Sequence, residues 1–356
     1  MSGSGAVVVP WTFRMAARAW VAVAVVMAGV ALAQTAASDI SPDIRMVLVR
    51  DLRFSTAELA DLQHGKVVKH GIATSAPGEI AAVGAVRVNA SKAAFLDRVR
   101  DIVRFKRGPD ILQIGRFGNP PSLDDLAALT VDKDDFDVRA CRVGDCSVRL
   151  PADVIRRFQQ EIDPKTPDAQ ERGAALFKQL LVDDVTAYMS GGAGRMTQYD
   201  DGPRPIRPIV EFEGILSNAP LISALVPGLP DHLRDFPAMH LSDAEDFLYW
   251  SKEKFGAAPF ITVTHVTIVC ASAETCVMTT KDVYSSRYLD ASLALTIASD
   301  AVATPNAFYL LYGNRFRANA LKGRWSALRR ALVERRARGG LEESLKTIKS
   351  QLETGR

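Results

Sequence analysis

The chain has 356 residues, of which 47% are hydrophobic and 24% are charged. This balance excludes a multispanning membrane protein, which has an apolar excess, and a disordered chain, which has a charge excess. The 44 basic and 41 acidic residues give a net charge of +3; without residues 1–33, which hold two arginines and no acid, the balance is 42 against 41. Such a charge requires no nucleic-acid partner.

The N-terminal segment has the pattern of a secretory signal peptide. Arg14 and Arg18 precede the apolar stretch 21–33, which ends in the small-x-small sequence that signal peptidase cleaves. As a helix this stretch spans about 20 Å, less than the hydrocarbon core of about 30 Å. We therefore predict cleavage after Ala33 and a periplasmic or secreted protein, with a retained anchor as the alternative. Met15 is an alternative to Met1 as the start codon.

Helices and strands alternate in the next part of the chain. Ser55 and Ser91 are suited as N-caps of helices over 56–64 and 92–105. A turn sequence at 75–78 predicts a hairpin of strands 66–72 and 79–88, and a further strand is predicted over 111–117.

An acidic segment follows, with six aspartates between positions 124 and 137. Calcium binding is the functional alternative to a solvated turn. An EF-hand loop needs a glycine and a distal glutamate that 132–137 does not supply, so the turn is the favoured interpretation.

The middle of the chain is predicted to be a mainly helical insertion of about 151–255, within a single α+β domain over 34–356. Helices are expected over 151–161 and 167–189, and the Gly- and Pro-rich segment 191–208 is the most loop-like stretch. Residues 209–216 alternate like a strand, which would place Glu211 and Glu213 on one face. A capping-box pattern, Ser242-x-x-Glu245, predicts a helix over 243–255.

The C-terminal part is the most regular. Antiparallel strands are predicted over 260–270, 276–283 continuing as 287–298, and 307–317, followed by a long amphipathic helix. Two apolar stripes interrupted at Gly339-Gly340 mark this helix: Leu321, Trp325, Leu328 and Leu332, then Leu341, Leu345, Ile348 and Leu352. Its arginine-rich face is expected to be solvated, with peripheral contact to anionic headgroups as the alternative.

The four cysteines form two close pairs in strand–turn–strand contexts. We predict hairpin disulfides Cys141–Cys146 and Cys270–Cys276, which agree with export to an oxidising compartment. The spacings lack the tight pattern of a zinc knuckle, so no metal site and no cofactor are predicted.

Familiar catalytic motifs are absent from the sequence. The five histidines form no H-E-x-x-H pattern, and there is no G-x-S-x-G elbow. The more suggestive polar groups lie on the C-terminal strands, where a few placed hydroxyl, imidazole and guanidinium groups would orient a mainly apolar ligand in a cavity. The candidate ligand-binding residues are His265, Tyr284, Arg287, Tyr288, Asp290, Tyr312 and Arg315. Strand alternation directs Tyr312 to the face opposite Arg315.

The order of these elements, a strand and helix over 79–105, then three antiparallel strands and a long terminal helix, resembles the helix-grip fold of START-like lipid-binding and polyketide-cyclase-type proteins. That resemblance implies an apolar cavity between the sheet and the last helix. The segments 83–88, 112–117, 141–146 and 284–293 are similar to those of uncharacterised exported bacterial proteins, which implies export and no particular reaction.

These observations predict a periplasmic binding or carrier protein that holds a hydrophobic or amphipathic small molecule under the C-terminal helix. One alternative is a hydrolase, isomerase or cyclase that uses His265 as a general base, with Tyr288 and Asp290 or Arg287 in the same cavity. Another is an envelope protein that binds a partner through 191–208 or the basic helix.

Overall fold

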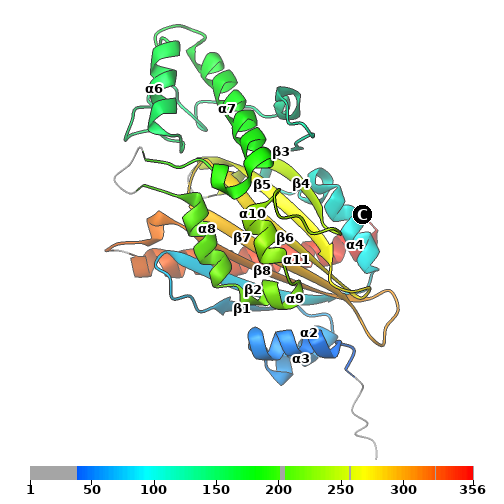
Figure 1. The fold of residues 1–356 in the computed structure, drawn as a ribbon. Helices are drawn as coiled ribbons and strands as arrows, with labels where there is room; N and C mark the ends of the chain where they lie inside the picture. The colour runs from blue at the N-terminus through cyan, green and yellow to red at the C-terminus, as the bar shows by residue number, and fades with distance from the viewer. Residues whose placement is uncertain (1–37, 201–204, 256–257, 325, 356) are drawn as a thin grey trace, which may run out of the picture. The chain divides into compact units, whose positions relative to one another are not determined.

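An open antiparallel sheet of eight strands is the centre of the fold (Figure 1). The computed structural model describes residues 38–200, 205–255, 258–324 and 326–355. All of these except Ser38 belong to one unit, Asp39–Arg356, which is described here. The predicted signal peptide and Trp325 lie outside the described residues.

The strands are ordered β1-β2-β8-β7-β6-β5-β4-β3, so the first hairpin pairs with the last strand of the chain. Their bounds are β1 Val68–Ile72, β2 Glu79–Val88, β3 Ile111–Arg116, β4 Glu245–Phe255, β5 Ala258–Cys270, β6 Thr275–Ser285, β7 Ala291–Asp300 and β8 Phe308–Arg317. Most central strands are buried on both faces, because helices cover each side of the sheet.

The helices come in three groups along the chain. Before β3 they are α2 Pro42–Met46, the π-helical turn η1 Val47–Asp51, α3 Thr56–Gln63, α4 Lys92–Arg100 and α5 Ile102–Phe105. Between β3 and β4 they are η2 Leu123–Leu126, α6 Ala152–Glu161, α7 Ala169–Gly191, η3 Gly192–Arg195, α8 Pro208–Ser217, α9 Pro220–Leu225 and α10 Leu229–Asp235. After β8 they are η4 Asn319–Leu321 and α11 Ser326–Thr354.

Helix α11 packs closely on β2 and β1, on one face of the sheet. Leu341, Leu345 and Leu352 are buried against side chains of β2, β8 and α4. Gly84 of β2 permits this approach, because a Cβ there would lie 2.3 Å from Leu341 Cδ2. On this face α11 covers β1 and β2, and α4 and α5 complete the same hydrophobic cluster.

The opposite face is covered by several shorter elements. Figure 1 shows α8, α9 and α10 over it, with α11 on the far side of the sheet. One hydrophobic cluster joins α2, η1 and α3 to strands β1, β2, β7 and β8. A second cluster joins α8, α9 and α10 to β5, β6 and β7. The cavity described below lies between these two clusters.

Much of the predicted order is confirmed. The hairpin pairs Val68 with Ala85, and helices begin after N-caps Ser55 and Ser91, whose hydroxyls accept hydrogen bonds from the first turn. Both predicted disulfides, Cys141–Cys146 and Cys270–Cys276, are present. The fold is α+β, with an antiparallel sheet, a long C-terminal helix and a helical middle segment, in a helix-grip-like arrangement.

The predicted strand over 209–216 is wrong: these residues form helix α8. Pro208 occupies the first turn of the helix, where its missing N–H costs nothing, and Phe212, Ile215 and Leu216 face the core at helical spacing. Glu211 and Glu213 consequently do not share a face. Glu211 pairs with Arg317 and Lys322, while Glu213 is exposed.

The predicted helix over 243–255 is also wrong, because β4 begins at Glu245. Phe247 and Tyr249 pack on the α11 side of the sheet, whereas Leu248 and Trp250 pack on the other side. Aromatic residues that are buried alternately on two faces favour a strand. The predicted insertion of about 151–255 therefore contains one strand of the sheet.

The first predicted stripe of the terminal helix is only partly right. Leu321 is buried, but Leu328 and Leu332 are 72% and 51% exposed. No break occurs at Gly339-Gly340, and α11 runs through both glycines. The second stripe is buried as predicted at Leu341, Leu345 and Leu352.

Candidate functional site

A cavity of about 440 Å³ lies between the sheet and the short helices on the face opposite α11. Its walls are side chains of β2, β7 and β8 on one side, and residues of η1 and α9 on the other. It runs from exposed Arg50 and Arg53 to Leu311, which is fully buried. This volume is within the range of small-molecule sites.

The inner wall of the cavity is apolar. Leu293, Leu295 and Ile297 alternate along β7, and Leu311 and Gly313 lie on neighbouring β8. A Cβ at Gly313 would meet its nearest neighbours at 3.8 to 3.9 Å, which is ordinary van der Waals contact. The absence of a side chain at Gly313 therefore enlarges the cavity. No neighbouring backbone of the described residues lies close enough to require a glycine there.

The outer end of the cavity carries charge. Arg50, Asp51 and Arg53 line it from η1 and the residues that follow. Arg50 makes a bidentate pair with Asp51, at 2.8 and 3.0 Å. Arg53 makes no hydrogen bond or ion pair among the described residues, and its backbone is left-handed, with φ of 62°.

A second charged group reaches the side wall of the cavity through Arg315. Arg315 of β8 faces the cavity and pairs with Glu79, which is completely buried. Arg317 binds the same carboxylate with Nε at 2.9 Å from Oε2. Arg317 and Lys322 also bind Glu211, at 3.1 and 3.2 Å. Two carboxylates here face three cations, so the group has an excess of one positive charge.

Asp246 of β4 is the centre of a separate, buried hydrogen-bond network. Its Oδ1 accepts from His232 Nε2 at 3.0 Å, from His265 Nε2 at 2.9 Å and from Thr267 Oγ1 at 2.7 Å. Tyr188 Oη donates to His265 Nδ1 at 2.8 Å. With its Nδ1 accepting and its Nε2 donating, His265 is a neutral imidazole.

The pKa values in this network follow from burial and hydrogen bonding. Burial alone would raise the pKa of the Asp246 carboxyl, but hydrogen bonds from His232, His265 and Thr267 outweigh burial and hold the pKa well below its ordinary value. Burial lowers the pKa of His265, and the hydrogen bond to Asp246 opposes this only in part.

Lys281 of β6 lies beside this network and is completely buried. Its Nζ donates to the Leu233 carbonyl at 2.6 Å and lies 4.9 Å from the ring centre of Tyr188 and 4.6 Å from that of Phe212. Burial lowers the pKa of this lysine to about 7, although Asp235 and Asp246 favour the charged form.

His232, His240 and Asp246 are the candidate metal ligands, with donor atoms within 4.8 Å of one another. The Leu241 N–H donates to His232 Nδ1 at 3.3 Å, which places the ring proton on Nε2. That nitrogen faces Asp246 and would need a free lone pair to bind a metal. The geometry therefore favours hydrogen bonding over coordination.

Of the predicted ligand-binding residues, Arg315 lines the cavity. His265 belongs to the Asp246 network, which contributes no residue to the cavity lining. Tyr312 packs on the α11 face, where burial raises its pKa to about 12. Tyr284 is buried beneath α7, and its Oη donates to the Arg149 carbonyl at 3.2 Å.

The remaining three predicted residues attach loops to the end of the sheet. Arg287 donates to the carbonyl of Ser147 at 2.8 Å, and Asp290 pairs with Arg149 at 2.8 Å. Burial raises the pKa of Asp290 to about 6. Tyr288 Oη donates to the Ala258 carbonyl at 3.0 Å. Ala258 lies roughly 23 Å along β5 from His265, at about 3.3 Å per residue.

Several residues of the cavity and the network did not emerge from the sequence. Leu293, Leu295 and Ile297 alternate within a predicted strand, so their common face was available as a signal. Arg53 gave no such signal, because the sequence around it contains no pattern that predicts a left-handed backbone. Asp246 was missed because residues 243–255 were predicted to form a helix.

No protein-family model matches the chain, and no curated protein matches it significantly in sequence. Among the described residues, no helix combines the length and apolar composition that a bilayer crossing requires. The two disulfides fit an oxidising compartment outside the cytoplasm.

Proposed function

We propose that this protein binds a small molecule with an apolar chain in the cavity between β7, β8 and α9, and acts as its carrier in the periplasm. The observation that carries the proposal is the cavity of about 440 Å³, whose inner wall is apolar and whose floor has glycine where a side chain would fit. A cavity with apolar walls and a few polar groups at one end suits an amphipathic ligand.

The resemblance to START-like proteins supports a ligand of the lipid-like class. The cavity, however, lies on the opposite face of the sheet from the one that the resemblance implies. Its lining contains no residue of α11. The helix instead packs on the other face of the sheet, against β2, through Leu341 and Leu345. The ligand is therefore held by the middle segment and η1.

A cavity-filling substitution tests the proposal. Gly313→Leu places a branched side chain in the cavity, and the ordinary contacts at its Cβ let the strand keep its backbone. The neutral fluorescent probe N-phenyl-1-naphthylamine should bind the wild-type protein and bind Gly313→Leu at least about tenfold more weakly, since several apolar contacts are lost. Native mass spectrometry before and after organic extraction would identify a bound molecule.

Gly339→Leu is the matched control, because a Cβ at Gly339 of α11 meets no described atom within 4 Å and the residue does not line the cavity. It should bind the probe like the wild type. Failure of the wild-type protein to bind any apolar probe, or equal binding by Gly313→Leu, would refute a ligand cavity here.

Peripheral membrane contact is a second candidate, favoured by the outer face of α11. Leu328 and Leu332 are exposed one turn apart, and Arg335 and Arg336 are exposed beside them. On the inner side of the helix, Val333 and Ala337 pack against the cluster of Ile80 and Phe316. An exposed apolar pair with flanking arginines suits an anionic lipid surface, from which a carrier would collect its ligand.

A further inference from the structure

We infer that the cavity selects ligands with an anionic group at the end of the apolar chain, and that Arg53 binds this anion. This inference rests on the proposed function, since it names the headgroup that the cavity would take. A fatty acid or an alkyl phosphate has the required chemistry.

The charges that line the cavity support an anion. Arg50, Arg53 and Arg315 contribute three positive charges and Asp51 one negative charge. Asp51 neutralises Arg50, and Glu79 is bound by Arg315 and Arg317 together. Arg53 is thus the lining guanidinium that lacks a carboxylate partner among the described residues, and it is available to a ligand anion.

The backbone around Arg53 is unusual in two ways. The preceding turn, η1, is π-helical, with the Leu52 N–H donating to the Val47 carbonyl at 3.0 Å, and π-turns occur frequently at functional sites. Arg53 itself has a positive φ of 62°, which is unfavourable for a residue with a long side chain. Phe54, buried next to it, anchors the chain and holds the arginine at the mouth.

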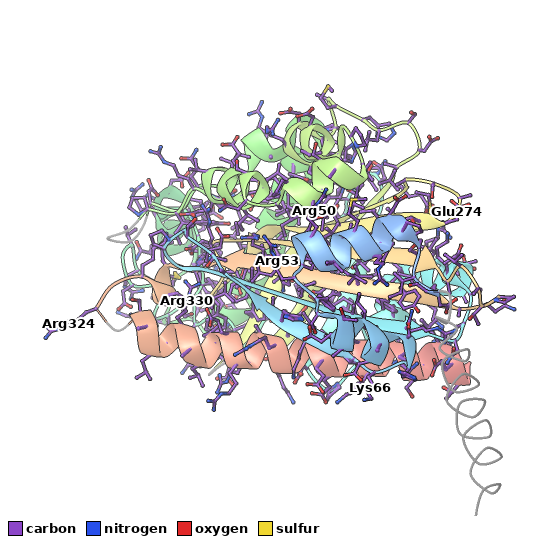
Figure 2. The ribbon with its side chains drawn as sticks, turned by 90° about the horizontal axis from the view of Figure 1, so that it is seen from below. Arg50, Arg53, Lys66, Glu274, Arg324 and Arg330 are labelled. Carbon is purple, nitrogen blue, oxygen red and sulfur yellow. A yellow bond between two sulfur atoms is a disulfide. The ribbon has the colours of Figure 1, made fainter. Side chains whose placement is uncertain are left out.

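The position of Arg53 also fits the shape of such a ligand. Figure 2 shows Arg50 and Arg53 at the same end of the α2–η1 helix. The apolar residues Leu295 and Leu311 lie deeper, on the strands. An apolar chain against the strands would leave its charged end beside the arginines, where water and guanidinium groups both solvate the anion.

Three ligands that share one chain test the inference: dodecanoate, dodecanol and dodecyltrimethylammonium. Each competes with N-phenyl-1-naphthylamine for the wild-type protein and for Arg53→Gln. Dodecanoate should bind the wild type about tenfold more tightly than dodecanol, as expected for a charge-assisted hydrogen bond. Arg53→Gln should remove this difference and leave dodecanol binding unchanged, and Arg53→Lys should restore part of it. Dodecyl phosphate separates a preference for phosphate from one for carboxylate.

Arg324→Gln is the matched control. Arg324 is exposed, has no hydrogen bond or ion pair among the described residues, and does not line the cavity (Figure 2). It should retain the preference for dodecanoate. Equal binding of dodecanoate and dodecanol, a preference for the cation, or an unchanged preference in Arg53→Gln would overturn the anion site while the carrier function stands. Absence of binding by all three ligands would refute both.

Discussion

Asp246 shows how a buried charge is tolerated at the scale of single residues. Its Oδ1 receives three hydrogen bonds, from His232, His265 and Thr267, and no lysine or arginine among the described residues forms an ion pair with it. Such a network stabilises the folded state while the His265 imidazole remains neutral and the Asp246 carboxyl remains ionised. It therefore makes stability depend on pH in two separate ranges.

We expect the free energy of unfolding to fall as pH decreases below about 6.5. Burial lowers the pKa of His265 in the folded protein, so the unfolded chain takes up this proton first and the folded state loses stability. A second loss begins below about pH 4, because the folded pKa of Asp246 is also lowered and its unfolded carboxyl becomes protonated first. Urea unfolding followed as a function of pH measures both.

Two variants test whether His265 causes the loss of stability below about pH 6.5. His265→Gln should flatten the decline below about pH 6.5, whereas His64→Gln, at an exposed position, should retain it. The pKa of Lys281 is about 7 in the folded protein and about 10.4 in the unfolded chain. Its titration therefore changes the free energy of unfolding mainly between about pH 7 and about pH 10.4, and not in the acid range. A wild-type stability that is constant from neutral pH down to about pH 5 would contradict the assignment.

The left-handed backbone of Arg53 predicts a conflict between stability and binding. Arg53→Gly removes the steric cost of a positive φ, so the free energy of unfolding should rise by about 1 kcal/mol. The same variant lacks the guanidinium and should lose the preference for dodecanoate. Thermal unfolding and the competition assay check the two effects. A loss of stability would show that the arginine side chain supports the fold instead.

At the scale of elements, α11 has two different surfaces. Its C-terminal half is buried on β2, where Gly84 admits Leu341 and Leu345. Its N-terminal half exposes Leu328 and Leu332 to solvent. The same apolar periodicity thus serves packing in one half and leaves an unpartnered surface in the other.

We expect the double variant Leu328→Gln and Leu332→Gln to bind phosphatidylglycerol vesicles at least about tenfold more weakly than the wild type. Since both residues are exposed, stability should change by less than about 0.5 kcal/mol. Vesicle co-sedimentation at two salt concentrations measures the effect, and higher salt should weaken wild-type binding. Val302→Gln, at a position 64% exposed outside α11, is the control. Equal binding by the double variant would eliminate this face as the lipid contact.

At the scale of the whole molecule, local patterns predicted most of the elements and less of the site. The hairpin of β1 and β2, the strands after β5 and the terminal helix all had clear apolar periodicity or turn sequences. Residues 209–216 and 243–255 were misassigned because short apolar stretches suit either a helix or a strand, and tertiary burial decides between them.

The cavity could not be located from the sequence for a different reason. Its wall combines Arg53, α9 and strands β7 and β8, which are distant in the chain, so only the folded topology brings them together. Arg315 was found because it lies on a predicted strand among other polar groups. His265 was found as well, but its partner Asp246 was assigned to a helix, and its hydrogen bonds could not be foreseen.

The cavity also separates two hydrophobic clusters that otherwise meet through few side chains. Leu225 and Leu295 contact both the cluster of α2, η1 and α3 and the cluster of α8 to α10. An apolar ligand chain between them would extend that contact and make the two groups of helices open as one cooperative unit. Dodecanoate should then slow amide hydrogen exchange in η1 and α9 together. The bound ligand would thus complete the hydrophobic core between the two clusters. Without it, the N-terminal helices would be the first to open in local unfolding.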